Sequence, residues 1–527
     1  MTTRRAIARF ALAVVPLAFV AVFFLWPVAA ILARGLGSQG TFDTHAFGRV
    51  FDDPALLQVM RFTVWQATLS TLLTLAVGLP ATAVLSRARF RGRLGIRALL
   101  VTPFVLPTIA VATAFQSLGV ERSLGAILLA HCFFNVAVIV RVVGTAWDAV
   151  DPRAEEAARV LGAGPLRVAW NVTLPALRAA IATAASIVFL FSFTSFGVIL
   201  VLGGPRFATI ETEIYRYTAE LLDLRTAAVL SVLQLVAVVA AMTAAGFASR
   251  RAGGLRPLGH RPRPAPPNAR TRALATVALL PALALVVTPV VELVRHAFAR
   301  GAEGFTHLTT TPVGLPDSPA HAIVTSLRIA VVATLLAVGL GLMLATAVTR
   351  GRSRLARFTE LLVVLPLGVS AVTVGFGFLI VFDRPPLDLR TAWIIVPIAH
   401  ALIALPFVVR TAVPILRAVD PHVRDAAALL GASPARVWFE IDRRAVTRAA
   451  GVAAAFAFAI SLGEFGATLF IVRPETTTVP VMIYRLLGRP GATNVDLAMA
   501  LTVVLMALTA TAAFVGDLGG HRRRAVI

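Results

Sequence analysis

The segment "DPRAEEAARVLGAGPLRVAW" occupies residues 151–170, and "DPHVRDAAALLGASPARVWF" occupies residues 420–439. The two copies match without a gap at an offset of 269 residues. Each begins with Asp-Pro, in which Asp caps a helix and Pro suits its first turn. The first helix should end at Gly162 or Gly431, and a second short helix should start at the proline that follows. The sequence therefore predicts a short amphipathic helical hairpin that occurs twice.

Apolar sequence surrounds both hairpins. The chain has 527 residues, of which 58% are hydrophobic and 14% charged, and its mean hydropathy is +0.84. A soluble protein carries about a quarter of charged residues, and several apolar runs here exceed the ~18 residues that indicate a membrane span. The sequence predicts an all-α polytopic membrane protein, because a β-barrel would instead alternate apolar and polar residues in short segments.

About twelve spans are expected, six on each side of a stretch rich in Pro, Gly and Arg. This stretch is an irregular linker at 250–272, between a first half at 1–249 and a second half at 273–527. The spans are expected near 10–33, 59–86, 98–118, 124–146, 179–202, 225–248, 273–295, 322–348, 358–381, 391–414, 449–472 and 494–516.

The formal net charge of +23 comes from arginines placed in alternate loops between the spans. This distribution follows the positive-inside rule and argues against nucleic-acid binding. It predicts that both termini, the linker and both hairpins face the cytoplasm, in the bacterial cytoplasmic membrane. Each half then begins and ends on the same side, so the halves form two parallel six-helix repeats.

The hairpin has two interpretations. A single copy could be an interfacial helix that only orders a loop. Two copies with the same cap, glycine and proline positions favour a docking surface for a partner that is present twice.

The first hairpin resembles the EAA loop of permeases of ATP-binding-cassette (ABC) importers. The residues that carry the resemblance are Glu156, Ala157, Ala158 and Gly162, with Asp425, Ala426, Ala427 and Gly431 in the second copy. The second copy departs at its end, where Arg443-Arg444 replaces Leu174-Pro175. The resemblance implies the type I importer permease fold, two ATPase subunits that dock on the two hairpins, an extracytoplasmic binding protein and no cofactor.

The chain itself is not expected to be an enzyme. The phosphate-binding motif GxxxxGK[ST] needs a lysine, and all 49 basic residues are arginine. ATP hydrolysis must therefore come from a separate subunit.

Two halves fused in one chain resemble the thiamine and the ferric-iron permeases of this class. The segments "GAILLAHCFFNVAVIVRV" (125–142), "SFTSFGVILVLGGPRFATIETEIYR" (192–216) and "ISLGEFGATLF" (460–470) are closest to the thiamine permease. Thiamine or a phosphorylated form is therefore the first expectation and ferric iron the alternative. No metal site is expected, because the sequence shows no cluster of metal ligands.

A twelve-helix secondary transporter is a further alternative. It would not need paired hairpins, but it would need ion sites within the membrane, and Glu464 alone stands out.

Glu464 is predicted to lie inside the eleventh span, where a charge costs roughly 2.5 kcal/mol or more. It could line the substrate pathway and favour a cation, or it could pair with Arg473 or Arg485 at the outer helix end. The matching residue of the first half is Ser195. The predicted pathway residues are Glu464, Ser192, Ser195, Ser461, Phe196 and Phe465.

Overall fold

The structure is a computed structural model that describes residues 12–38, 41–42, 45–88, 90–120, 122–251, 269–350 and 365–521. It is a helical bundle with a two-residue antiparallel ribbon of β1 (Gly37–Ser38) and β2 (Thr41–Phe42). Ten described helices are long and apolar enough to cross a membrane, and a bent pair adds an eleventh span. The predicted all-α polytopic fold is confirmed.

The first half contains a helix from Leu12 that continues through η1 (Ala21–Leu25) into α2 (Trp26–Leu36). It continues with α3 (His45–Asp52), α4 (Pro54–Arg87), α5 (Arg93–Val101), η2 (Thr102–Val105), α6 (Thr108–Ser117), α7 (Leu124–Trp147), α8 (Pro152–Val160), α9 (Pro165–Val168), η3 (Ala169–Thr173), α10 (Leu174–Phe193), α11 (Gly197–Leu202), η4 (Pro205–Phe207), α12 (Ile210–Ala219) and α13 (Leu224–Arg251).

The second half repeats this order. Its described elements are α14 (Ala269–Ala297), α15 (Glu303–Thr306), η5 (His307–Thr309), α16 (Pro319–Arg350), η6 (Leu365–Gly368), α18 (Ala371–Val381), α19 (Ile395–Arg417), α20 (Pro421–Leu429), α21 (Pro434–Val437), η7 (Trp438–Asp442), α22 (Arg443–Gly463), α23 (Gly466–Ile471), η8 (Pro474–Thr476), α24 (Val479–Leu487) and α25 (Ala492–His521).

Four predicted spans differ from the single straight helices expected. The span at 98–118 is broken, with a 108° bend between Arg93–Val105 and Thr108–Ser117. Pro107 stands at this break and keeps the residue before it extended. The span at 358–381 lies partly outside the described residues, and its described end is α18.

The fifth and eleventh spans end about nine residues earlier than the sequence predicts. In the first half, α10 stops at Phe193 and the chain turns before α11. In the second half, α22 stops at Gly463, and the extended backbone of Glu464 separates it from α23. Polar residues mark both breaks, Ser192 and Ser195 in the fifth run and Glu464 in the eleventh, but the apolar residues on either side of them extend the predicted helices past these positions.

The first helix of each half packs on the other half. α2 contacts α18 of the second half, while α14 contacts α4 and α6 of the first. Glycine permits one of these approaches, because a Cβ added at Gly377 would lie 2.8 Å from Cβ of Pro27. The rings of Phe23 and Phe382 add to this contact at 5.4 Å between centroids. The two sequence halves are therefore interlocked in space.

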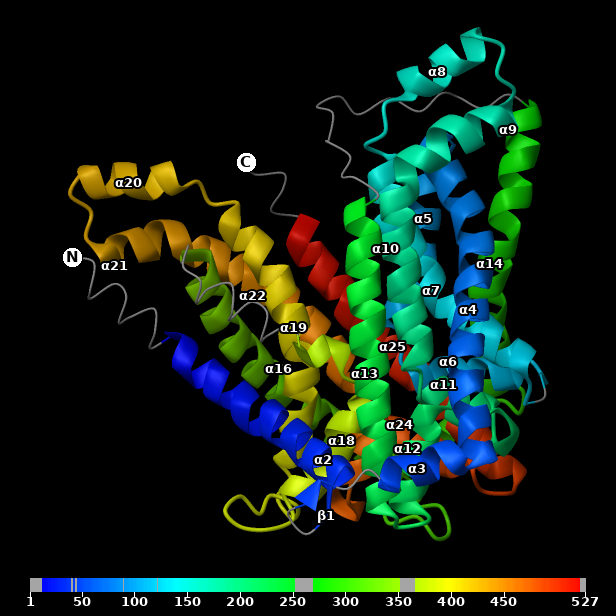
Figure 1. Ribbon diagram of the computed structural model, residues 1–527, viewed down its shortest axis with the longest axis vertical. Helices are drawn as coiled ribbons and strands as arrows, with labels where there is room; N and C mark the ends of the chain where they lie inside the picture. The colour runs from blue at the N-terminus through cyan, green and yellow to red at the C-terminus, as the bar shows by residue number, and fades with distance from the viewer. Residues whose placement is uncertain are drawn as a thin grey trace.

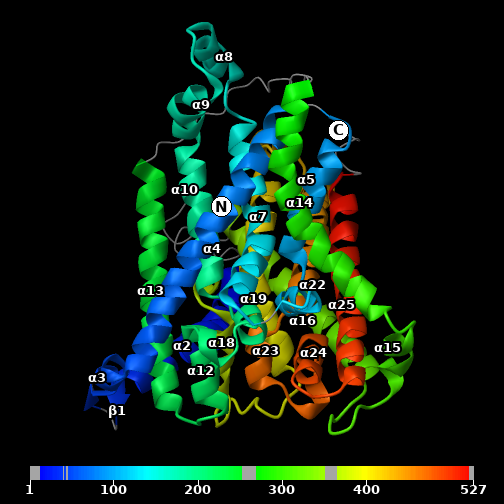
Figure 2. The same cartoon turned by 90° about the vertical axis from the view of Figure 1, so that its right-hand side faces the viewer.

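The two hairpins lie at the same end of the bundle. Figure 1 shows α8 and α20 at the upper end, whereas α12, α18 and α24 lie toward the opposite end. The side view in Figure 2 again places α8 beyond the ends of the long helices, with α12 and α24 at the opposite end. This common polarity follows from the parallel repeat.

Candidate coupling and translocation sites

Each hairpin exposes a pair of adjacent apolar side chains at its tip. Val160 and Leu161 are 87% and 88% exposed, and the matching Leu429 and Leu430 are 90% and 88% exposed. Exposed apolar groups that recur at equivalent positions mark a contact surface rather than a chance feature. They give each hairpin an apolar tip that the described chain itself does not cover.

An exposed aromatic ring lies in the π-helical turn that follows the second short helix of each hairpin. Trp170 is 69% exposed and its counterpart Phe439 is 58% exposed. Large aromatic residues contribute strongly to protein interfaces. Each hairpin therefore presents two aliphatic side chains and one ring.

The predicted coupling residues lie on these hairpins, and both glycines take a left-handed backbone. Gly162 has φ +84° and Gly431 has φ +82°, a region that residues with a Cβ rarely adopt. Glu156, Ala157, Gly162, Asp425, Ala426 and Gly431 are exposed, and Ala158 and Ala427 are half-buried.

A buried carboxylate fastens the first hairpin to the bundle. The Glu155 side chain is only 6% exposed, and its carboxylate accepts hydrogen bonds from Arg87 at 2.7 Å and from Thr173 at 3.0 Å. Arg87 is the last residue of α4, while Thr173 precedes α10. This clamp joins the hairpin to two membrane-spanning helices, and the sequence pattern gave no sign of it.

An ion pair also fastens the second hairpin, but here the residue on the hairpin is the base and its partner is the acid. Arg424 occupies the position of Glu155, and Asp442 occupies that of Thr173. Arg424 Nε donates to Asp442 Oδ1 at 2.8 Å, and the Asp442 side chain is 8% exposed. The acid therefore moves from the hairpin to the start of the following helix, next to the Arg443-Arg444 departure from the EAA pattern.

An aromatic layer joins the halves at the end away from the hairpins. The rings of Phe196 and Phe465, equivalent residues of the two halves, stack with centroids 5.6 Å apart. Tyr215 packs on Phe196 at 5.7 Å, and Tyr484 packs on Phe465 at 5.6 Å. The two phenylalanines are 6% and 2% exposed, so this layer fills the space between the halves at that level.

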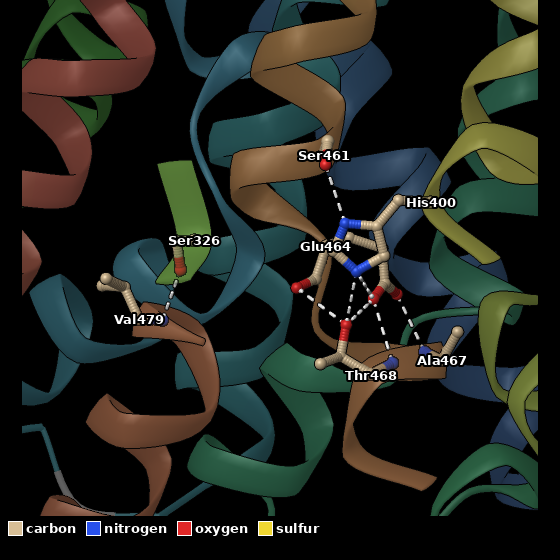
Figure 3. Close-up of polar contacts among 7 residues, drawn as sticks. All are labelled: Ser326, His400, Ser461, Glu464, Ala467, Thr468 and Val479. Carbon is tan, nitrogen blue, oxygen red and sulfur yellow. Dashed lines mark hydrogen bonds and ion pairs between the residues drawn. The ribbon is translucent and has the colours of Figure 1, made fainter. Parts of the chain in front are cut away.

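The structure places Glu464 beside Phe465, buried and capping α23 (Figure 3). Its carboxylate accepts from the backbone N–H of Ala467 at 2.8 Å and of Thr468 at 3.0 Å. His400 Nε2 lies 3.3 Å from Glu464 Oε2. The side chain is 4% exposed, so the ionisable partner of Glu464 is a histidine of α19 rather than Arg473 or Arg485.

His400 bridges this carboxylate to the helix that carries it. Its Nδ1 lies 2.7 Å from Ser461 Oγ, and its Nε2 lies 2.8 Å from Thr468 Oγ1. Ser461 is buried and therefore contacts His400 instead of an open passage. The cluster fixes the chain break that positions Phe465.

The first half builds a different polar cluster at the matching place. Gln66 Nε2 donates to the backbone oxygen of Ser192 at 2.8 Å, and Asn135 lies within 3.4 Å of Ser192 Oγ. His131 Nδ1 lies 3.0 Å from Ser70 Oγ. Ser195 is half-buried at the position equivalent to Glu464. The first half thus holds its break without a carboxylate.

Three further polar contacts were not apparent from the sequence. The buried Glu211 accepts a hydrogen bond from Ser370 of the other half at 2.8 Å. In addition, Thr63 and Ser326 accept from the backbone N–H groups of Ile210 and Val479 at 3.1 Å and 2.8 Å, and Figure 3 includes the second of these contacts. The sequence did carry a signal for the last two contacts, since α4 and α16, the second and eighth spans, each have a hydroxyl residue at the matching place.

The comparisons identify a class of membrane transport protein. The family described as "Binding-protein-dependent transport system inner membrane component" matches residues 74–252. The chain is also 32% identical over 244 residues to the "Molybdenum transport system permease protein ModB" of Mycobacterium bovis (strain ATCC BAA-935 / AF2122/97), with 44% of this chain and 89% of ModB covered. The chain belongs to this family of ABC importer permeases.

Longer relatives extend over both halves. The chain is 27% identical over 490 residues to the "Thiamine transport system permease protein ThiP" of Escherichia coli (strain K12), covering 88% of this chain and 89% of that protein. It is 28% identical over 515 residues to the protein of the same name from Brucella abortus (strain 2308), covering 93% and 91%. These relatives therefore match the chain across both of its halves.

Proposed function

We propose that this permease imports thiamine or a phosphorylated form of thiamine. The similarity to thiamine permeases over about nine-tenths of the chain carries this proposal. Ferric iron is not favoured, since the similar full-length relatives are named for thiamine.

The family implies a binding protein that delivers the substrate and an ATPase that drives transport. The membership also removes the secondary-transporter alternative. We assign the first permease half to 1–249, the linker to 250–272 and the second half to 273–527. The match of ModB to 44% of this chain supports one permease unit per half.

Two ATPase subunits would dock on the two hairpins. The exposed apolar pairs Val160-Leu161 and Leu429-Leu430 support this assignment, because each hairpin offers the same surface once. The clamps at Glu155 and Arg424 would transmit the motion of a docked subunit to the long helices. The hairpins, the linker and both termini would then face the cytoplasm.

Glu464, Ser192, Ser195, Ser461, Phe196 and Phe465 remain the proposed pathway residues, with different roles. The stacked Phe196 and Phe465 would close the passage. Glu464 and Ser461 would hold Phe465 in place through His400. In this arrangement Glu464 acts on the passage through the ring next to it.

Substrate uptake tests the main proposal. Cells that lack their own thiamine importer would receive this permease with its ATPase and binding protein, and uptake of radiolabelled thiamine would be measured. ATP-dependent uptake that excess unlabelled thiamine abolishes, and ferric citrate does not, is expected. Saturable uptake of iron without uptake of thiamine would overturn the assignment.

Orientation has a separate test. A reporter that is active only outside the cytoplasm would be fused after Arg263, in the linker, and in a second fusion protein it would be inserted within 311–316, between η5 and α16. The first fusion should be silent and the second active. The reverse pattern would mean that the hairpins face outward and cannot meet an ATPase.

A further inference from the structure

A cavity of about 820 Å³ opens on the outer surface of the first half, at the end away from the hairpins. It lies between the first part of α4, the η4 turn and α12. Figure 2 shows α4 running along the outside of the bundle toward this end. Its lining combines basic, acidic and aromatic side chains, which is unusual for a lipid-facing surface. The chemistry-bearing residues are Asp53, Arg61, Arg206, Glu213, Arg216, Phe62, Trp65, Phe207 and Tyr217.

Two of the arginines are available to a ligand. Arg216 pairs with Glu213 at 3.2 Å. Arg61 and Arg206 are exposed and form no ion pair with any residue in the described part of the chain. The guanidinium of Arg206 stacks over the Phe207 ring at 5.6 Å, which orders it while leaving its N–H groups free. Two free guanidinium groups in one cavity suit a phosphate.

The same cavity contains groups that suit an organic cation. Asp53 lines it and uses one carboxylate oxygen to accept from Ala55 N at 2.8 Å, which caps α4. The rings of Trp65 and Tyr217 complete that side of the lining. Aromatic faces beside a carboxylate attract ammonium groups.

The second half shows that the fold does not require this combination. Thr63 of α4 and Ser326 of α16 accept from the equivalent residues Ile210 and Val479, so α16 matches α4 at an offset of 263 residues. The matching cavity, of about 630 Å³, has Thr325 in place of Phe62 and Thr476 in place of Phe207. Arg328 replaces Trp65 there. The second cavity keeps a ring and an acid, Trp393 and Glu475, but Glu475 stands where the first half has Arg206. The same helices therefore assemble without an arginine at that place, so Arg206 in the first half points to a ligand.

The depth of the cavity matches the headgroup region of a membrane. α4 has 34 residues, so it is ~51 Å long and exceeds a hydrocarbon core of ~30 Å by about 20 Å. Shared equally between the two ends, this excess is about 10 Å, or about seven residues, at each end. Arg61 is seven residues from Pro54, at this boundary. Trp65 and Val64 follow it and are 54% and 50% exposed, as in the aromatic belt of membrane proteins.

We propose that this cavity binds the headgroup of a zwitterionic phospholipid from the leaflet opposite the hairpins. Arg61 and Arg206 hold the phosphodiester, and the ammonium group lies toward Asp53 and the rings. The acyl chains extend along the exposed face of α4 past Trp65. A soluble phosphate ester that carries a cation, such as phosphoethanolamine or thiamine monophosphate, has the same chemical groups and is the competing ligand.

Native mass spectrometry of the purified, delipidated full chain tests this proposal. Phosphatidylethanolamine and phosphatidylglycerol with identical acyl chains would be titrated separately. The wild-type protein should bind phosphatidylethanolamine more tightly, and R61Q/R206Q should weaken that binding by about ten-fold or more. The control R328Q, in the matching cavity of the second half, should leave it unchanged.

Two further measurements test the contact with the ammonium group and distinguish a lipid from a soluble phosphate ester. Asp53→Asn keeps a residue that caps helices well but removes the charge, so it should abolish the preference for phosphatidylethanolamine. Millimolar phosphoethanolamine or thiamine monophosphate should not displace the lipid. Displacement by either solute, equal binding of the two lipids to wild type, or unchanged binding in R61Q/R206Q would overturn the proposal. None of these readouts involves uptake, so they are independent of the thiamine assignment.

Discussion

The clamp beneath the first hairpin gives a quantitative prediction for Glu155→Ala. The substitution removes a carboxylate that is 6% exposed and accepts from Arg87 at 2.7 Å and from Thr173 at 3.0 Å. Hydrogen bonds to a charged group are worth about 1.5–3 kcal/mol. Because Arg87 is 25% exposed and regains water, the lower part of this range, about 2 kcal/mol, is expected. This energy would shift the equilibrium between the clamped and released hairpin by ~30-fold.

The assay is ATP-driven uptake by proteoliposomes that contain the permease, its ATPase and its binding protein. Released hairpins still present their apolar tips, so ATP hydrolysis should continue while substrate transported per ATP falls several-fold. Arg159→Gln is the matched control on the same helix. Arg159 is 55% exposed and 3.5 Å from Glu155, and such surface pairs contribute little, so its coupling should stay close to wild type.

Charge exchange provides the decisive comparison. Glu155→Arg alone places two arginines together and should be at least as defective as Glu155→Ala. Adding Thr173→Asp reproduces the Arg424–Asp442 arrangement of the second half and should restore most of the coupling. Normal transport per ATP in Glu155→Arg, or no recovery in the double variant, would refute the clamp.

Four other substitutions test the hairpins and the aromatic layer. Gly162→Val and Gly431→Val impose a strained positive φ and should uncouple hydrolysis from uptake in proteoliposomes, with membrane insertion unchanged by immunoblot; full uptake in both would contradict docking there. Glu464→Gln keeps the shape of the cap but weakens the contact with His400, so uptake should fall several-fold at normal protein levels; loss of the protein would indicate a structural role. Phe465→Ala removes the stacked ring and should let labelled thiamine leak into liposomes without ATP, whereas tight liposomes would exclude Phe465 as a barrier.

The hairpins and the long helices could be predicted because their signals are local. Asp151 and Asp420 each cap the helix that begins at the next residue, because their carboxylates accept from the N–H groups of Arg153 and His422, two residues further along the chain. The left-handed backbone of Gly162 and Gly431 depends on the residue type at that one position. Likewise, the length of an apolar run is sufficient to predict a membrane-spanning helix.

The partner of Glu464 could not be predicted in this way. Sequence reasoning offered arginines at 473 and 485 because they lie nearby in the chain, whereas the structure brings in His400, 64 residues away. A buried carboxylate takes the partner that helix packing places within reach, and that depends on the crossing of α19 with α22. The end of the eleventh span at Gly463 was missed for a related reason, since Glu464 stabilises that break through a long-range contact.

The sequence by itself determined the membrane class, the two-fold repeat and the two helical hairpins. These features follow from hydrophobicity and from hydrogen bonds between residues close in the chain. Only the tertiary structure decided the exchange of first helices between halves, the stack of Phe196 on Phe465 and the reversed charges of the two clamps. Each of these depends on which side chains meet when helices from distant parts of the chain pack together, and many helix arrangements are compatible with the same pattern of spans.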